Sequence, residues 1–193
     1  MPKKRNGLRE LLAAGAPTLG THLLASWPGL VEIVGTAVQP GLLADHPEAA
    51  APVEAMLEDR DGRLWLALQT GGLVRVTAGQ VTLLTCESGL STNSVRCLCE
   101  DRAGILWAGT LGGGVNRNDG ARLSVTTSRE GLPSNGVMGL ARDPDGSIWA
   151  GTWGGVSRYQ NHDLNGGPCL PVEALAGADA KSILRTRRGC TWV

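Results

Sequence analysis

Glu100-Asp101-Arg102-Ala103-Gly104-Ile105-Leu106-Trp107 is the stretch that decides the fold, because its pattern occurs three times in the chain. The same succession of polar residues, a glycine, an apolar residue and a tryptophan ends at Trp65 and again at Trp149. The three tryptophans are 42 residues apart in both intervals. A repeat with a period of about 40–50 residues indicates a chain built from stacked copies of one supersecondary unit.

Further landmarks on both sides of this stretch keep the same spacing. Gly113-Gly114-Val115-Asn116-Arg117 matches residues 71–75 and, after a one-residue deletion, residues 154–158. Gly131-Leu132-Pro133-Ser134-Asn135 matches residues 89–93. A weaker fourth copy ends at Trp192, 43 residues after Trp149. The repeat is therefore defined by several motifs in register and not by tryptophan alone.

Each unit has the pattern of four short strands separated by glycine-containing turns. In the second unit we expect strands at Val95–Cys99, Ile105–Thr110, Val115–Asn118 and Ala121–Val125. Residues 101–104, 112–114 and 118–120 lie between them and contain the Gly, Asp and Asn that tight turns favour. Four short strands with tight turns form one blade of a β-propeller. The repeated tryptophan, on the second strand, is expected to fill the space between adjacent blades.

The predicted fold is therefore all-β: a partial β-propeller of about three four-stranded blades plus a truncated fourth. We expect blades at about residues 53–88, 95–127, 137–165 and 180–193. Residues 37–52 are rich in Ala, Pro and Gly and are interpreted as a linker. Residues 1–36 do not fit the repeat, and we expect them to form a short αβα-like N-terminal appendage.

The repeat resembles the two-component regulator propeller repeat. The resemblance is carried by Gly131-Leu132-Pro133-Ser134-Asn135, by Leu106-Trp107-Ala108-Gly109-Thr110 and by Gly155-Val156-Ser157-Arg158-Tyr159. It covers residues 53–160 clearly and 180–193 weakly. It implies a piece of an extracytoplasmic sensor, which in that family is usually a seven-bladed propeller before a membrane span and a signalling output. Many such sensors respond to glycans.

The N-terminal segment resembles the start of the HpcH/HpaI class II aldolases, in residues 17–22 and 27–35. We expect a helix at residues 6–12, a strand at 18–24 and a second helix at 28–34. The resemblance implies a metal-dependent lyase with a His base, an Arg and acidic metal ligands. No later residue of this chain matches those positions, and such a barrel needs about 250 residues. No catalytic residue is therefore assigned, and His22 is interpreted as an ordinary strand residue.

Composition limits the partners and the compartment. The formal net charge is zero, which gives no electrostatic reason to expect binding to nucleic acid or to an anionic membrane. No stretch approaches the ~20 apolar residues of a membrane span. The N-terminus has the basic start Lys3-Lys4-Arg5, but the charged Arg9 and Glu10 follow it. The segment therefore fits a signal peptide poorly. The sequence predicts a cytoplasmic chain by default, whereas the family resemblance implies the periplasm.

The five cysteines do not form a recognisable framework. Their number is odd and their spacing irregular, so no set of disulfides is predicted. Cys97 and Cys99 would point to the same face of a strand, which is poor spacing for a zinc knuckle. We interpret these thiols as small buried or half-buried side chains.

Two patterns resemble ligand loops but are better explained as turns. Asp59-Arg60-Asp61-Gly62 and Asp143-Pro144-Asp145-Gly146 resemble the opening of a calcium loop, but a strand follows at once and the second unit has Ala103. Gly112-Gly113-Gly114 lacks the Lys-Ser/Thr of a phosphate-binding loop and precedes a strand. The sequence predicts turns at all three places.

Three arginines occupy one repeated position and three aspartates another. We expect the arginines to pair with the aspartates, although they could instead line one surface. The arginines are Arg75, Arg117 and Arg158, and the aspartates are Asp59, Asp101 and Asp143. None of the three histidines, His22, His46 and His162, lies in an activating motif.

The sequence therefore assigns no catalytic, cofactor-binding or metal-binding residue. It predicts a ligand-binding or sensory propeller module that is not an enzyme and is a fragment of a longer sensor. The expected partner is an unidentified ligand, a glycan by family resemblance, or a protein. Self-association through exposed blade edges is also expected. The alternatives are a truncated aldolase-type lyase and a non-functional remnant of a gene fusion.

Overall fold

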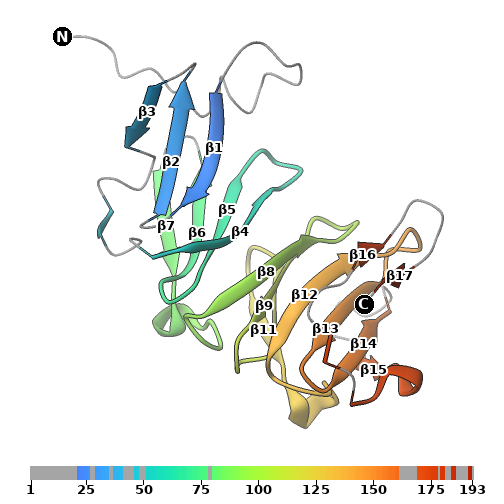
Figure 1. The fold of residues 1–193 in the computed structure, drawn as a ribbon. Helices are drawn as coiled ribbons and strands as arrows, with labels where there is room; N and C mark the ends of the chain where they lie inside the picture. Colours follow the sequence, from blue (N-terminus) through green and yellow to red (C-terminus); the bar gives the residue numbers. More distant parts are fainter. Residues whose placement is uncertain are drawn as a thin grey trace.

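The computed structural model describes residues 21–26, 29–34, 37–40, 46–47, 51–77, 80–160, 169–177, 179–180, 184–185 and 191–192. Over these residues the fold is a succession of antiparallel sheets that follow one another along an arc in chain order (Figure 1). Three sheets have four strands each, a three-stranded sheet precedes them and a two-stranded sheet follows. This confirms the predicted all-β, propeller-like architecture.

Each four-stranded sheet is a simple meander in which consecutive strands pair. The first contains β4 (Val53–Glu58), β5 (Leu64–Leu68), β6 (Gly72–Thr77) and β7 (Gln80–Leu84). The second contains β8 (Val95–Glu100), β9 (Leu106–Thr110), β10 (Val115–Asn118) and β11 (Leu123–Thr126). The third contains β12 (Val137–Arg142), β13 (Ile148–Thr152), β14 (Gly155–Tyr159) and β15 (Cys169–Pro171). The four strands expected in the second unit are all present, with ends that differ from the expected ones by at most two residues.

The segments between the sheets contain single 3-10 turns that the sequence did not reveal. They are η2 (Cys86–Ser88), η3 (Ser128–Glu130) and η4 (Glu173–Leu175). Thr85 and Thr127 cap the first two turns through capping boxes, and Gly89 and Gly131 end them with φ near 100°. The left-handed backbone at those two positions is the reason for glycine there. Among the described residues no helix is long and apolar enough to cross a membrane.

The N-terminal segment differs from the expectation. β1 (Thr21–Ser26), β2 (Gly29–Val34) and β3 (Ala37–Pro40) form an antiparallel sheet in the order β1-β2-β3. The helix expected at residues 28–34 is therefore wrong, because that segment is the central strand of this sheet. Its Val31, Ile33 and Val34 are β-branched, which favours a strand paired on both sides. The helix expected at residues 6–12 lies outside the described residues.

This arrangement also removes the aldolase interpretation. A βα barrel joins parallel strands through helices, whereas β1 and β2 are antiparallel neighbours. Residues 37–52, expected as a linker, contain β3. The first strands of successive sheets lie side by side, β4 beside β8 and β8 beside β12, and β1 likewise contacts β4 (Figure 1). The N-terminal sheet is thus stacked on the repeats.

The core lies between the sheets, where the repeated tryptophans are. Trp65, Ala67 and Leu73 of the first sheet share a cluster with Leu106 and Ala108 of the second. One repeat later, Trp107 shares a cluster with residues of the third sheet, among them Ile148, Ala150 and Tyr159. Burying a large side chain of this kind contributes about 2–3 kcal/mol. The predicted role of the tryptophans as fillers between stacked sheets is confirmed for Trp65 and Trp107, whereas Trp149 is half-buried.

Candidate binding face

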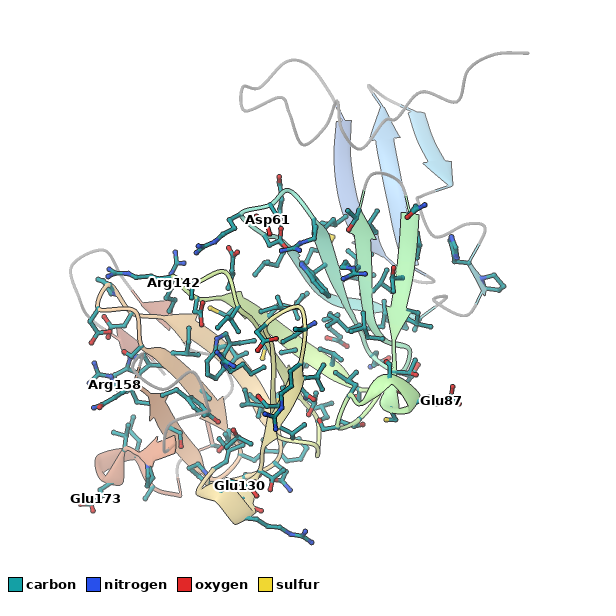
Figure 2. The ribbon with its side chains drawn as sticks, turned by 180° about the vertical axis from the view of Figure 1, so that it is seen from behind. Asp61, Glu87, Glu130, Arg142, Arg158 and Glu173 are labelled. Atoms are coloured by element: carbon teal, nitrogen blue, oxygen red, sulfur yellow. The ribbon has the colours of Figure 1, made fainter. Side chains whose placement is uncertain are left out.

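The two ends of the stacked sheets carry different side chains. The first end has the turns between the first and second strands, residues 59–63, 101–105 and 143–147. We call it the acidic-turn end. The second end has the turns between the second and third strands and the loops that enter each sheet. In Figure 2, Asp61 and Arg142 lie toward the first end, and Glu87 and Glu130 lie on 3-10 turns toward the second.

At the acidic-turn end, each repeated aspartate binds its own tryptophan, and the first two also hold the backbone of their turns. Asp59 Oδ1 accepts hydrogen bonds from the backbone N–H of Asp61 at 3.0 Å and of Arg63 at 2.9 Å. Asp59 Oδ2 accepts from Trp65 Nε1 and from Arg63 Nε, both at 2.7 Å. Burial by itself would raise the pKa of Asp59, but these hydrogen bonds and the Arg63 cation hold the pKa below 3.8. The carboxylate is therefore committed to the fold.

The same geometry recurs in the second sheet, and its bond to tryptophan recurs in the third, where the N–H of Ser147 donates to Asp145 Oδ1 instead. Asp101 Oδ1 accepts from the N–H groups of Ala103 and Ile105, and its Oδ2 accepts from Trp107 Nε1 at 2.9 Å. Asp143 Oδ2 accepts from Trp149 Nε1 at 3.1 Å. These aspartates are buried, and their contacts build turns, as the sequence predicted. No cluster of potential metal ligands occurs among the described residues.

The arginines do not have the partners that the sequence predicted. The guanidinium carbons of Arg75, Arg117 and Arg158 lie over the rings of Trp65, Trp107 and Trp149, at 5.9, 5.9 and 5.4 Å from the ring centroids. The expected pairing with Asp59, Asp101 and Asp143 is replaced by these cation–π contacts.

The strand register explains this difference. Each arginine lies directly opposite its tryptophan on the neighbouring strand, as in the pair Trp107↔Arg117. The aspartate of the same turn binds the indole N–H instead. Arg117 forms its ion pair with Asp119 at 4.0 Å, and Arg158 pairs with Asp145. The arginines still serve the repeat, but through the tryptophan.

Charged groups at this end also connect one sheet to the next. Arg60, in the first turn, binds Glu100 Oε1 through Nε at 3.2 Å and donates to the carbonyl oxygens of Asp101 and Arg102. Arg142 of the third sheet donates to the carbonyl oxygen of Glu100 at 3.2 Å. These charges are therefore used within the stack.

Cys97 and Cys99 agree with the interpretation as half-buried structural side chains, whereas Cys86, which is exposed, does not. Cys97 and Cys99 pack against the core between the second and third sheets. Burial raises the pKa of Cys97 to about 12 and that of Cys99 to about 11. Cys86 is exposed on η2. The side chains of Cys169 and Cys190 lie outside the described residues.

At the opposite end, the recurring loop motif joins neighbouring sheets. The Asn93 side chain accepts from the N–H of Cys86 at 2.8 Å, and its carbonyl oxygen accepts from Gly72 N. The Asn135 carbonyl oxygen accepts from Gly112 N at 3.0 Å and Gly114 N at 2.9 Å. Two N–H groups of the triple-glycine stretch are thus used by the fold, so a turn and not a phosphate cradle is what the structure contains. Gly114 is required because a Cβ there would lie 2.1 Å from the carbonyl oxygen of Thr126.

One position at this end differs from repeat to repeat. Gln69, Leu111 and Trp153 begin the equivalent turns, and their N–H groups donate to the carbonyl oxygens of residues 52, 94 and 136 at 2.9, 2.9 and 3.1 Å. The backbone contact is the same in each sheet, but the side chain is not. Trp153 is 52% exposed, and Met56 is the other large hydrophobic side chain that is exposed among the described residues.

Around Trp153 a group of loop residues without ionisable side chains can be defined, although Glu87 and Glu130 lie on the 3-10 turns of the same end and Asp179 directly precedes Ala180, whose N–H donates to the carbonyl oxygen of Thr152. We call residues 69–71, 91–94, 111–113, 133–136 and 153–154 the uncharged loop face; they consist of Gln, Thr, Ser, Asn, Gly, Pro, Leu and Trp. Sequence reasoning missed this face. The available signal was that Trp153 is a tryptophan outside the 42-residue series. Of the histidines, His46 is half-buried outside this face, the side chain of His22 on β1 is not described, and His162 lies outside the described residues.

Sequence comparison supports the repeat assignment over part of the chain. A family model described as "Two component regulator propeller" matches residues 89–112 and 131–154. Each match runs from the entering loop through the first two strands to the following turn. No curated protein matches the chain significantly. The resemblance of the N-terminal segment to aldolases receives no support from these comparisons.

Structural comparison shows the same fold in larger proteins. The extracellular domain of the hybrid two-component system BT3049 from B. thetaiotaomicron matches with a TM-score of 0.73 and 18% identity, over 91% of this chain and 25% of that chain. PorZ, a surface component of the type-IX secretion system of Porphyromonas gingivalis, matches with 0.67 and 19% identity, over 93% and 30%. Virginiamycin B lyase from Staphylococcus aureus matches with 0.61 and 15% identity, over 90% and 62%. This chain thus has a propeller fold and spans about a quarter of the BT3049 domain.

Proposed function

We propose that this chain is a ligand-binding part of an extracytoplasmic sensor, that it is not an enzyme, and that it binds an uncharged glycan on the uncharged loop face. The observation that carries the proposal is the half-exposed Trp153 on a face without ionisable side chains. The similarity to an extracellular sensor domain supports the sensor role and the extracytoplasmic location.

The choice of face follows from how a repeat protein divides its residues. Positions that recur serve the stacking, as the Asp–Trp–Arg contacts and the asparagine loops do here. Positions that vary on one surface while the backbone stays the same are available for binding. At the position of Gln69, Leu111 and Trp153 the side chain varies while the backbone hydrogen bond is the same in all three sheets, so this position is available for binding.

The side chains of this face suit a neutral, hydroxyl-rich molecule. Thr92 Oγ1 accepts from the N–H of Ser94 at 3.3 Å, and Ser134 Oγ accepts from the N–H of Gly136 at 3.2 Å. A hydroxyl that accepts in this way can still donate its own proton to a ligand oxygen. An exposed indole supplies a large apolar surface beside these hydroxyls. A charged ligand would find no counter-ion among the residues of this face.

The test is binding of the purified chain to an immobilised array of neutral and acidic oligosaccharides. The proposal predicts binding to neutral members that changes little with salt, because no ion pair is formed. Preference for acidic members, or no binding to any neutral member, would refute it. Mass spectrometry of the bound oligosaccharide should show an unchanged mass, and cleavage would contradict the non-enzymatic role. Arg60→Ala, at the opposite end, is the matched control and should bind as the unmodified chain does.

A further inference from the structure

We infer that Trp153, seated on the backbone of Gly136, is the residue on which a pyranose ring of the ligand stacks. The inference rests on the proposed function and specifies which residue of the uncharged loop face makes the decisive contact. It is carried by the packing of the indole, by a comparison among the three sheets, and by the residues around the ring.

The indole ring lies directly against the Gly136 backbone. A Cβ added to Gly136 would lie 2.4 Å from Trp153 Cε3, 2.7 Å from Cδ2 and 2.8 Å from Cζ3. Carbon atoms do not approach so closely, so any side chain at residue 136 would displace the ring. The backbone of Gly136 is not in the left-handed region, unlike that of Gly155. The ring, and not the turn, therefore requires glycine at this position.

The other two sheets show that this glycine is not part of the repeat. Ser94 precedes the first strand of the second sheet and accompanies Leu111, and Pro52 in the first sheet accompanies Gln69. The loop keeps the same hydrogen bond with a side chain present at residue 94. Glycine thus occurs only in the sheet that carries a tryptophan on the turn. Gly136 and Trp153 thus occur together, and they place an aromatic ring at the surface, where it does not contribute to the core between the sheets.

The surroundings of the ring suit a sugar. Leu111 of the second sheet forms a β-bridge with Gly136, so an apolar side chain lies on the other side of the glycine. Beside the ring, a Cβ on Gly154 would lie 3.3 Å from the Cβ of Ser134. A pyranose presents a face of C–H groups and an edge of hydroxyls. The electron-rich indole face attracts such C–H groups, and the Ser134 hydroxyl lies close enough to the turn to meet the hydroxyl edge.

The experiment measures affinity for the best-bound neutral oligosaccharide of the array by isothermal titration. Trp153→Ala should weaken binding about tenfold or more, since losing a stacked aromatic surface is worth at least that factor. Met56→Ala removes the other exposed large hydrophobic side chain of the described residues, which lies on β4 outside the uncharged loop face. It is the matched control and should change the affinity less than about threefold. Gly136→Ala keeps the indole but displaces it, so its affinity should fall between those of the two other variants. Circular dichroism should show that all three variants are folded.

Intrinsic fluorescence gives a second, independent measurement. Binding of the oligosaccharide should change the tryptophan emission of the unmodified chain and leave that of Trp153→Phe unchanged. If the unmodified chain binds a neutral oligosaccharide and Trp153→Ala binds it equally well, the stacking inference is wrong while the proposed function stands. If the unmodified chain binds no neutral oligosaccharide, the proposed function fails, and the inference fails with it.

Discussion

The indole Nε1 of Trp107 donates a hydrogen bond of 2.9 Å to Oδ2 of Asp101, which lies six residues earlier at the start of the same turn. Both groups are buried, with 7% and 3% exposed. The other oxygen of Asp101 accepts from the N–H groups of Ala103 and Ile105. One carboxylate thus fixes the turn between β8 and β9 and orients the ring that fills the space before the third sheet.

Replacing Asp101 should therefore destabilise the chain markedly. In Asp101→Asn an amide N–H₂ must face either the indole N–H or the two backbone N–H groups, so at least one buried donor loses its acceptor. The expected loss of unfolding free energy is about 2–3 kcal/mol. Urea denaturation followed by tryptophan fluorescence measures it. The control is Asp61→Asn, which removes only a surface ion pair with Arg63 and should cost less than about 1 kcal/mol. Equal losses in the two variants would contradict this role.

A second prediction compares two equivalent positions in neighbouring sheets. Asn116 is buried and bonds Ser91 twice, accepting from its N–H at 2.9 Å and donating to its Oγ at 2.7 Å. In the third sheet Ser157 and Pro133 take these positions. Proline has no N–H to offer, and the buried Ser157 hydroxyl has no hydrogen-bond partner among the described residues.

Asn116→Ala should therefore cost about 2 kcal/mol, since it leaves the N–H of Ser91 without its acceptor. Ser157→Ala should change the stability by less than about 0.5 kcal/mol or raise it, because it removes an unpaired buried hydroxyl. Both values come from urea denaturation at the same protein concentration. A larger loss for Ser157→Ala than for Asn116→Ala would show that the two positions are not equivalent.

The repeat carried the prediction of the fold because each copy supplies independent support for the same register. Trp65, Trp107 and Trp149 had to occupy equivalent places for their spacing to persist, and they do. The N-terminal segment has no second copy to compare. There a short likeness at residues 17–35 suggested a strand followed by a helix, while the pairing of β2 with strands on both sides produced a sheet.

The partners of individual side chains were less predictable than the strands. The position of Arg117 on its strand was clear, but whether it meets Asp101 or Trp107 depends on cross-strand register and on which group has already taken the carboxylate. Trp153 was missed for a related reason. A search for recurring residues finds what stabilises the stack, and the exposure of a residue that does not recur is decided only by packing.

The low pKa of Asp59 predicts how stability depends on pH. The folded pKa lies below 3.8, so the unfolded chain binds more protons and the stabilisation is present above 3.8 and lost as the pH falls through the folded pKa. Asp119, Asp145 and Glu130, whose pKa values are also lowered, contribute in the same direction. Asp59→Asn should therefore show a shallower fall in unfolding free energy below pH 3.8 than the unmodified chain. Urea denaturation between about pH 2.5 and about pH 6 spans the range in which carboxyl groups titrate. Parallel curves for the two proteins over that range would contradict the contribution of Asp59.

The cysteines report directly on the contact between the second and third sheets. Cys86 is exposed, whereas Cys97 and Cys99 are half-buried with pKa values raised to about 12 and about 11. Alkylation needs the thiolate and access to it, so Cys97 and Cys99 should react on the order of 100-fold more slowly than Cys86 with iodoacetamide at mildly alkaline pH. Peptide mass spectrometry resolves the three sites, and all three should react at similar rates in concentrated urea. Rapid native labelling of Cys97 would mean that the second and third sheets are not packed together, because its side chain packs against the cluster that contains Trp107 of one sheet and Ile148 of the other.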